Sequence, residues 1–143
     1  MDMQGRLVAV LSEVLPVQRE EDGAITVQHD GTFASLRVVE VAEDLELVSL
    51  TQVLAWDLPL DAKLRAKVAD HAHSTLLGTV SLAAKSSAKQ IAAGAKRNSK
   101  KVADVLLRYN FPAAGLTDDA LRTLIMMVLA TGADVRRALV VAT

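Results

Sequence analysis

Cysteine is absent from this 143-residue chain, and aromatic residues make up only 3% of it. The absence of cysteine excludes disulfides, thiolate metal sites, iron–sulfur clusters and a cysteine nucleophile. It is compatible with the cytosol, and we expect a cytoplasmic protein. The scarcity of aromatics means that leucine, valine and alanine must fill the core. It also argues against a stacking platform for single-stranded nucleic acid.

Long apolar runs and a strong charge of either sign are missing too. The net charge is −1, so no overall field steers the protein towards nucleic acid or anionic lipid, and nucleic acid is not the expected partner. No apolar stretch approaches the roughly 18 residues of a membrane span. The run Leu7–Leu11 is short for a signal peptide, and Glu13 follows it closely. We therefore expect no association with a membrane.

The sequence also lacks the common motifs of catalysis and cofactor binding. It contains no Gly-x-Ser-x-Gly elbow, no His-Glu-x-x-His and no dinucleotide glycine pattern. His71 and His73 lie two residues apart, which on a helix turns them to different faces, whereas a chelating pair needs a spacing of four. We predict no catalytic residue, no cofactor and no metal ligand. An enzyme built from scattered aspartate, histidine and serine side chains is left as an open alternative.

One long amphipathic stretch, Leu116–Val141, dominates the rest of the chain and predicts a helix. Thr117 suits its N-cap, and Asp118 places negative charge in the first turn, where the helix dipole favours it. Its apolar residues recur at steps of three and four, which puts them on one face. They are Leu121, Leu124, Ile125, Val128, Leu129, Val135 and Leu139. We expect the middle of this stripe, including Leu124, to be nearly fully buried against a sheet.

The remaining segments predict two shorter helices and about five strands. The helices are expected at Met3–Leu15 and at about Asp61–Leu77. The strands are expected at Ala24–His29, Thr32–Val41, Leu45–Leu58, Thr79–Ala84 and Val102–Phe111. Asp30-Gly31 predicts a type I′ turn between the first two strands. The order α-β-β-β-α-β-β-α predicts one α+β domain over residues 1–143, with helices packed on an antiparallel sheet.

The strand Leu45–Leu58 carries large apolar residues on both faces. Simple alternation puts Leu45 and Leu47 on one face and Leu54 and Trp56 on the other, where Gln52 interrupts the apolar series. Either both faces are covered or a bulge exchanges them. Three helices cannot easily cover both sides of such a sheet, so we expect a homodimer built on apolar surface. A bulge that turns these side chains inward would instead leave a monomer.

Four stretches that together span most of the chain share the spacing of a known group. They are Asp30-Gly31 with its strands, the strand ending Leu58-Pro59-Leu60-Asp61, the helix ending Leu76-Leu77-Gly78-Thr79, and Leu107–Phe111 followed by Gly115-Leu116-Thr117 and the closing helix. With this pattern the chain resembles the YbjN family, whose fold is like that of the type III secretion chaperones. The resemblance implies helices on an antiparallel sheet, frequent homodimers and a non-enzymatic binding or regulatory role. Family members often carry asparagine where this chain has Asp70-His71-Ala72-His73, and the loop after the fourth strand is longer and more basic here.

The segment 85–101 is the most basic part of the sequence and contains no acid. Its basic residues are Lys85, Lys89, Lys96, Arg97, Lys100 and Lys101. Such a segment can bind phosphate, nucleic acid or an acidic protein segment, or it can be a solvated hairpin loop. It lacks the Gly-Lys-Ser/Thr ending of a phosphate-binding loop. Trp56 is either a core residue or an anchor for a partner, because tryptophan is enriched at binding hot spots.

The hypothesis that these features favour is a non-enzymatic protein-interaction module, chaperone-like or regulatory. It would bind an unidentified protein segment or a second copy through apolar sheet and helix surface. The candidate partner-binding residues are Phe33, Trp56, Lys96, Arg97, Lys100 and Lys101. The alternative is a regulator that binds nucleic acid or another anionic partner through the basic loop 85–101. A large exposed apolar surface favours the module, a continuous basic patch favours the regulator, and a deep pocket of titratable groups favours an enzyme.

Overall fold

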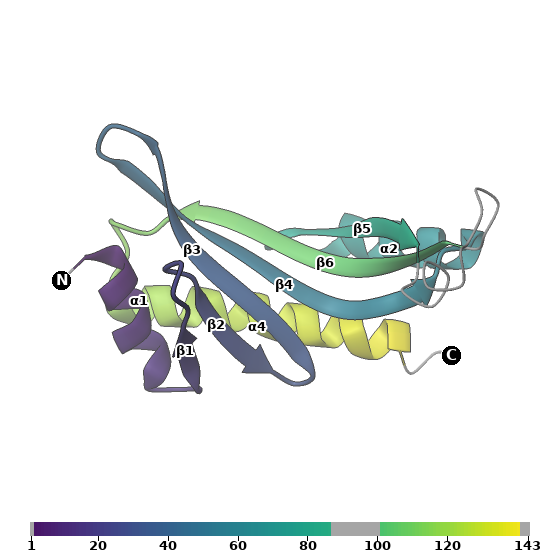
Figure 1. Cartoon of the computed structure of the whole chain (residues 1–143), viewed down its shortest axis with the longest axis horizontal. Coiled ribbons are helices and arrows are strands. Elements are labelled where there is room, and N and C mark those ends of the chain that lie inside the picture. The colour runs from purple at the N-terminus through teal and green to yellow at the C-terminus, as the bar shows by residue number, and fades with distance from the viewer. Residues whose placement is uncertain (1, 87–100, 141–143) are drawn as a thin grey trace.

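The computed structural model describes residues 2–86 and 101–140, which form a six-stranded antiparallel sheet with three helices (Figure 1). The strands lie in the order β1-β2-β3-β4-β6-β5. In chain order the elements are α1 (Met3–Ser12), β1 (Val17–Arg19), β2 (Ile25–His29), β3 (Thr32–Ala42), β4 (Leu45–Pro59), α2 (Ala62–Ser74), β5 (Thr79–Ser86), β6 (Lys101–Pro112) and α4 (Asp118–Val140). The α+β class and the antiparallel sheet are confirmed.

The sheet has six strands where the sequence predicted about five. The extra strand is β1, which pairs with β2 over only three residues and is too short to show an alternating pattern. The predicted turn at Asp30-Gly31 is present, because both residues have positive φ angles (46° and 80°) and join β2 to β3. The helix α2 ends at Ser74, earlier than predicted, since Thr75 already has an extended backbone. Leu76, which the predicted range Asp61–Leu77 placed in the helix, lies beyond its end and is 88% exposed.

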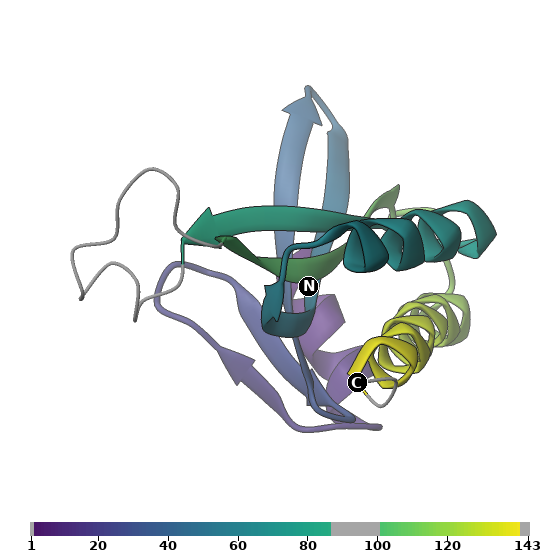
Figure 2. The ribbon, with the colours of Figure 1, turned by 90° about the vertical axis from the view of Figure 1, so that its right-hand side faces the viewer.

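The three helices of the described residues all lie on the same side of the sheet, which we call the inner face (Figure 2). The long helix α4 crosses β2, β3 and β4 and contacts α1, whereas α2 packs on β5. Ile125, Val128 and Leu129 of α4 are fully buried, as the sequence predicted. Leu124 is only half-buried, so the prediction for this residue was wrong. It lies at the edge of the helix stripe beside Leu116 and Met127, in a shallow depression on the helix surface.

A buried amide fastens α4 to the centre of the sheet. Gln52 of β4 has no exposed surface, and its Nε2 donates to Thr32 Oγ1 at 2.8 Å and to the Leu129 carbonyl at 3.1 Å. Gly132 of α4 lies directly over this side chain, and a Cβ atom there would be 2.1 Å from Gln52 Oε1. The residue that interrupts the apolar series of β4 is thus accommodated by a glycine on the opposing helix.

The strand β4 changes face near its end through two irregularities. The register with β6 shifts between Val53 and Ala55 and again between Ala55 and Leu58. Leu54 and Ala55 are consecutive, yet both side chains are buried on the inner face. This extra inward-facing residue reverses the alternation of the residues that follow, beginning with Trp56. Trp56 consequently points to the opposite face and is 42% exposed. The prediction that Trp56 shares a face with Leu54 was therefore wrong, and the bulge turns it outward rather than inward.

Candidate interaction surface

The side of the sheet away from the helices, here called the outer face, carries none of the three described helices (Figure 2). The strand register places Phe33, Val53 and Leu106 in one row across β3, β4 and β6. Trp56 joins them through the bulge. Val53 and Leu106 are half-buried, and Phe33 and Trp56 are 44% and 42% exposed. We call these four residues the outer-face patch.

The two aromatic rings of the patch hold each other in place. Phe33 and Trp56 make an edge-to-face contact with ring centroids 6.2 Å apart and an interplanar angle of 77°. This geometry suits the ring quadrupoles and stabilises the pair by about 0.5–1.5 kcal/mol beyond area burial. The rings are fixed against each other and still expose much of their surface. They form a preorganised apolar platform, for which fewer side-chain rotamers are lost on binding.

Three charged side chains border the bulge that presents Trp56. Lys85 Nζ lies 3.0 Å from Asp57 Oδ1 and 2.9 Å from Asp104 Oδ1, and the Asp57 backbone N–H donates to Asp104 Oδ1 at 3.0 Å. The hydrogen bonds to Asp104 and then to Asp57 raise the pKa of Lys85 above its usual value. Asp57 adopts φ = 55°, a left-handed conformation that aspartate tolerates better than most residues. The three groups tie β4, β5 and β6 together beside Trp56.

The outer face beyond the patch alternates between polar and apolar rows. Ser35, Thr51 and Arg108 form the adjacent row, and Val39 and Leu47 lie further along towards the β3–β4 hairpin. That hairpin extends past the body of the sheet in Figure 1. Its Val39, Val41 and Leu45 side chains are 40–52% exposed. Apolar surface is therefore distributed over much of the outer face, with polar rows that can supply hydrogen bonds.

Of the six candidate partner-binding residues, the structure brings Phe33 and Trp56 into contact. Lys101 is exposed at the start of β6, whereas Lys96, Arg97 and Lys100 lie outside the described residues. Lys85, from the same basic segment, is paired with two aspartates.

Sequence reasoning missed Val53 and Leu106 as members of the patch. Leu106 could have been found, because it alternates with the inward-facing Val105 and Leu107. The pairing of Asp57 and Asp104 with Lys85 left no signal, because the three residues are far apart in sequence.

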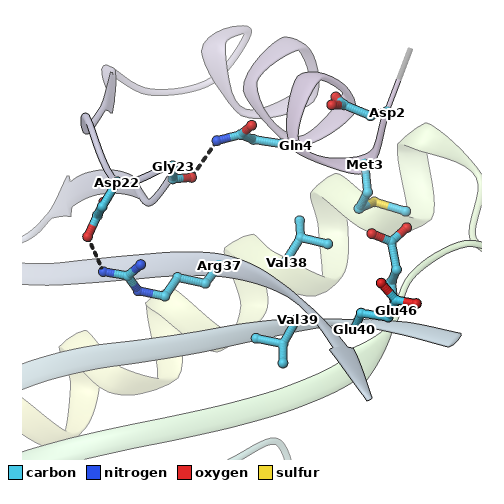
Figure 3. Close-up of a pocket in the computed structure, with 10 residues that line it drawn as sticks. All are labelled: Asp2, Met3, Gln4, Asp22, Gly23, Arg37, Val38, Val39, Glu40 and Glu46. Carbon is cyan, nitrogen blue, oxygen red and sulfur yellow. Dashed lines mark hydrogen bonds and ion pairs between the residues drawn. The ribbon is translucent and has the colours of Figure 1, made fainter. Parts of the chain in front are cut away.

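A cleft of about 580 Å³ opens at another place, between the start of α1, the β1–β2 turn and the β3–β4 hairpin (Figure 3). Its lining includes the carboxylates of Asp2, Asp22, Glu40 and Glu46. Arg37 Nη2 donates to Asp22 Oδ2 at 2.6 Å, and this hydrogen bond is the main cause that lowers the pKa of Asp22 below its usual value. Nowhere in residues 2–86 and 101–140 do three or more histidine or carboxylate side chains gather in a way that could hold a metal ion.

Comparison with family models, characterised proteins and solved structures finds no match to this chain. None of the helices in the described ranges has the length and apolar character needed to cross a membrane.

Proposed function

We propose that this chain is a non-enzymatic protein-interaction module that binds through the outer face of its sheet. The observation that carries the proposal is the Phe33–Trp56 pair, two aromatic side chains in contact and each more than 40% exposed on the sheet face that none of the described helices covers. Contiguous exposed apolar surface on a folded domain commonly marks an interaction site. Tryptophan is also enriched at the residues that dominate binding energy.

The partner that we propose first is a second copy of the chain, in a two-fold homodimer. A two-fold contact needs a self-complementary surface, and a sheet face with alternating apolar and polar rows can meet its own copy in this way. The resemblance to the YbjN family supports the same arrangement, together with a fold like that of the type III secretion chaperones. The cytoplasmic location that we propose is compatible with the absence of cysteine. A chaperone-like module could also hold an extended or helical segment of another protein on this face.

The test uses two serine substitutions and a matched control. Phe33→Ser and Trp56→Ser each remove one ring of the outer-face patch, and Leu76→Ser removes a large apolar side chain that is 88% exposed elsewhere. We expect the parent chain and Leu76→Ser to sediment as dimers at micromolar concentration. The two patch variants should sediment near the single-chain 15.2 kDa, with circular dichroism spectra like that of the parent.

The single tryptophan gives an independent readout, because Trp56 is the only one in the chain. If a second copy covers the outer face, the fluorescence emission of Trp56 should shift to the blue as the protein concentration is raised through the range in which the dimer forms. Parent protein that stays at the single-chain mass, with unchanged emission, would refute the homodimer. The module would then bind only other proteins. If Phe33→Ser behaves like the control Leu76→Ser in both measurements, the outer-face patch is not the binding surface, and this part of the proposal is refuted.

A further inference from the structure

The edge of β3 is paired on one side only beyond Leu36. The strand β2 pairs with β3 from Thr32 to Leu36, whereas β4 pairs with β3 along nearly its whole length to Ala42. Within the described part of the chain, no strand lies against the β2 side of Arg37–Glu40. Successive residues of an antiparallel strand direct their N–H and C=O groups to opposite sides. Half of the peptide groups of this segment therefore point away from β4 and can pair with an added strand.

The cleft of Figure 3 runs along this free edge. Arg37, Val38, Val39 and Glu40 form one wall, and the start of α1 with the β1–β2 turn forms the other. The volume of about 580 Å³ lies in the range of sites that hold ligands. Four strand residues span roughly 13 Å at about 3.3 Å per residue. The register shift between Glu40 and Ala42 ends the regular edge towards the hairpin tip. The free edge therefore suits a short extended segment of about four paired residues.

The charges along the edge define what that segment should carry. Glu40 and Glu46 are direct cross-strand partners, and both line the cleft together with Asp2. Like charges placed directly opposite each other destabilise an antiparallel pair. Arg37 is the only basic side chain among the described residues of the lining, and it is already paired with Asp22. A lysine or arginine of an incoming segment would place a positive charge between the two glutamates and relieve their repulsion.

We propose that Arg37–Glu40 is a docking edge for an extended basic protein segment, which adds to the sheet as a strand beside β3. Main-chain hydrogen bonds to the edge supply affinity, and Glu40 with Glu46 selects a lysine or arginine side chain. This site is distinct from the outer-face patch, because it uses the edge of the sheet rather than its face. It therefore does not depend on the proposed dimer.

The probe for this proposal is a fluorescein-labelled, end-capped peptide, Thr-Lys-Val-Lys-Val-Lys-Thr, followed by fluorescence anisotropy with the full chain. Two matched peptides separate the contributions. The first carries N-methyl groups on alternate residues, which remove the N–H donors of one edge, and the second replaces each lysine with glutamate. We expect saturable binding of the parent peptide and no binding of either matched peptide. Equal binding of the N-methylated peptide would overturn the added strand, and no binding of the parent peptide would overturn the site.

The protein variants test the charge selection. The double substitution Glu40→Gln and Glu46→Gln should weaken binding of the parent peptide about tenfold, because it neutralises the two carboxylates next to the incoming cation. Glu43→Gln in the turn of the same hairpin is the control, since it removes one charge outside the cleft lining, and it should bind like the parent.

Amide exchange measured by NMR should show peptide-dependent protection within residues 37–40. Phe33→Ser should leave peptide binding unchanged, so that failure of this site and failure of the outer-face patch are told apart. Protection that maps to the outer-face patch instead would refute the docking edge.

Discussion

Substitution of Gly132 by alanine tests how α4 is seated on the sheet. A Cβ atom at this position would lie 2.1 Å from Oε1, 2.4 Å from Cδ and 2.7 Å from Nε2 of Gln52. Gln52 cannot yield easily, because its side chain is fully buried and donates to Thr32 and to the Leu129 carbonyl. Either the helix lifts from the sheet or the amide gives up its hydrogen bonds.

The magnitude follows from three opposing contributions. Overpacking of a filled core costs about 1–3 kcal/mol. Displacement of a buried amide from its partners costs about 1–3 kcal/mol more. Alanine in place of glycine inside a helix returns up to about 1 kcal/mol. We therefore expect Gly132→Ala to lower the free energy of unfolding by about 1–6 kcal/mol. For a chain of this size Tm falls by about 3–4 °C for each kcal/mol.

Urea unfolding followed by circular dichroism measures the loss, and a double-mutant cycle with Gln52→Ala identifies its cause. Once the amide is truncated, the added methyl group has room, so the two substitutions should be non-additive by at least about 1 kcal/mol. Gly115→Ala is the control, because no atom lies within 4 Å of the added Cβ there. The reasoning would be refuted if Gly132→Ala were as stable as the parent. It would also be refuted if the losses in free energy of unfolding from Gly132→Ala and Gln52→Ala simply added in the double variant.

Three further substitutions probe charges on the surface. Glu46→Lys turns the repulsive pair with Glu40 into an attractive one and should raise the free energy of unfolding by about 0.2–1 kcal/mol, measured in urea. Lys85→Met should release the bulge beside Trp56, which a shift in tryptophan emission would report while the secondary structure stays intact. Arg37→Gln should raise the Asp22 pKa towards its usual value in an NMR titration. Because the folded-state pKa of Asp22 is lowered, its pairing stabilises the fold above the unfolded value of about 3.9 and is lost as the pH falls through the folded value. The stability difference between parent and Arg37→Gln should therefore vanish in acid.

Elements with a regular pattern and terminal signals were predictable from sequence. The long helix starts at Asp118, one residue after its predicted cap, and Thr117 Oγ1 accepts from the Ala120 N–H as a capping residue should. The turn at Asp30-Gly31 formed as expected because the pair tolerates positive φ at both positions. In such cases the local chain chemistry and the tertiary structure favour the same conformation.

The candidate site was less predictable, because it depends on a break in the pattern. Alternation along β4 assigns Trp56 to the core, and only the added residue of the bulge at Ala55 reverses this assignment. The left-handed conformation of Asp57 is stabilised by contacts from β5 and β6, which a local reading of the sequence cannot include. The three-residue β1 was missed for a related reason, since its formation depends on pairing with β2.

The bulge in β4 also affects how the protein can change over evolutionary time. A residue in regular register at this point would face the core, where every change of volume disturbs its neighbours. Because the bulge removes position 56 from the core, its side chain can be replaced without leaving a cavity beneath it. The side chains at positions 56 and 33 can therefore diverge among descendants of this chain, and with them the chemistry of the outer-face patch, while the packing between the sheet and α4 stays the same.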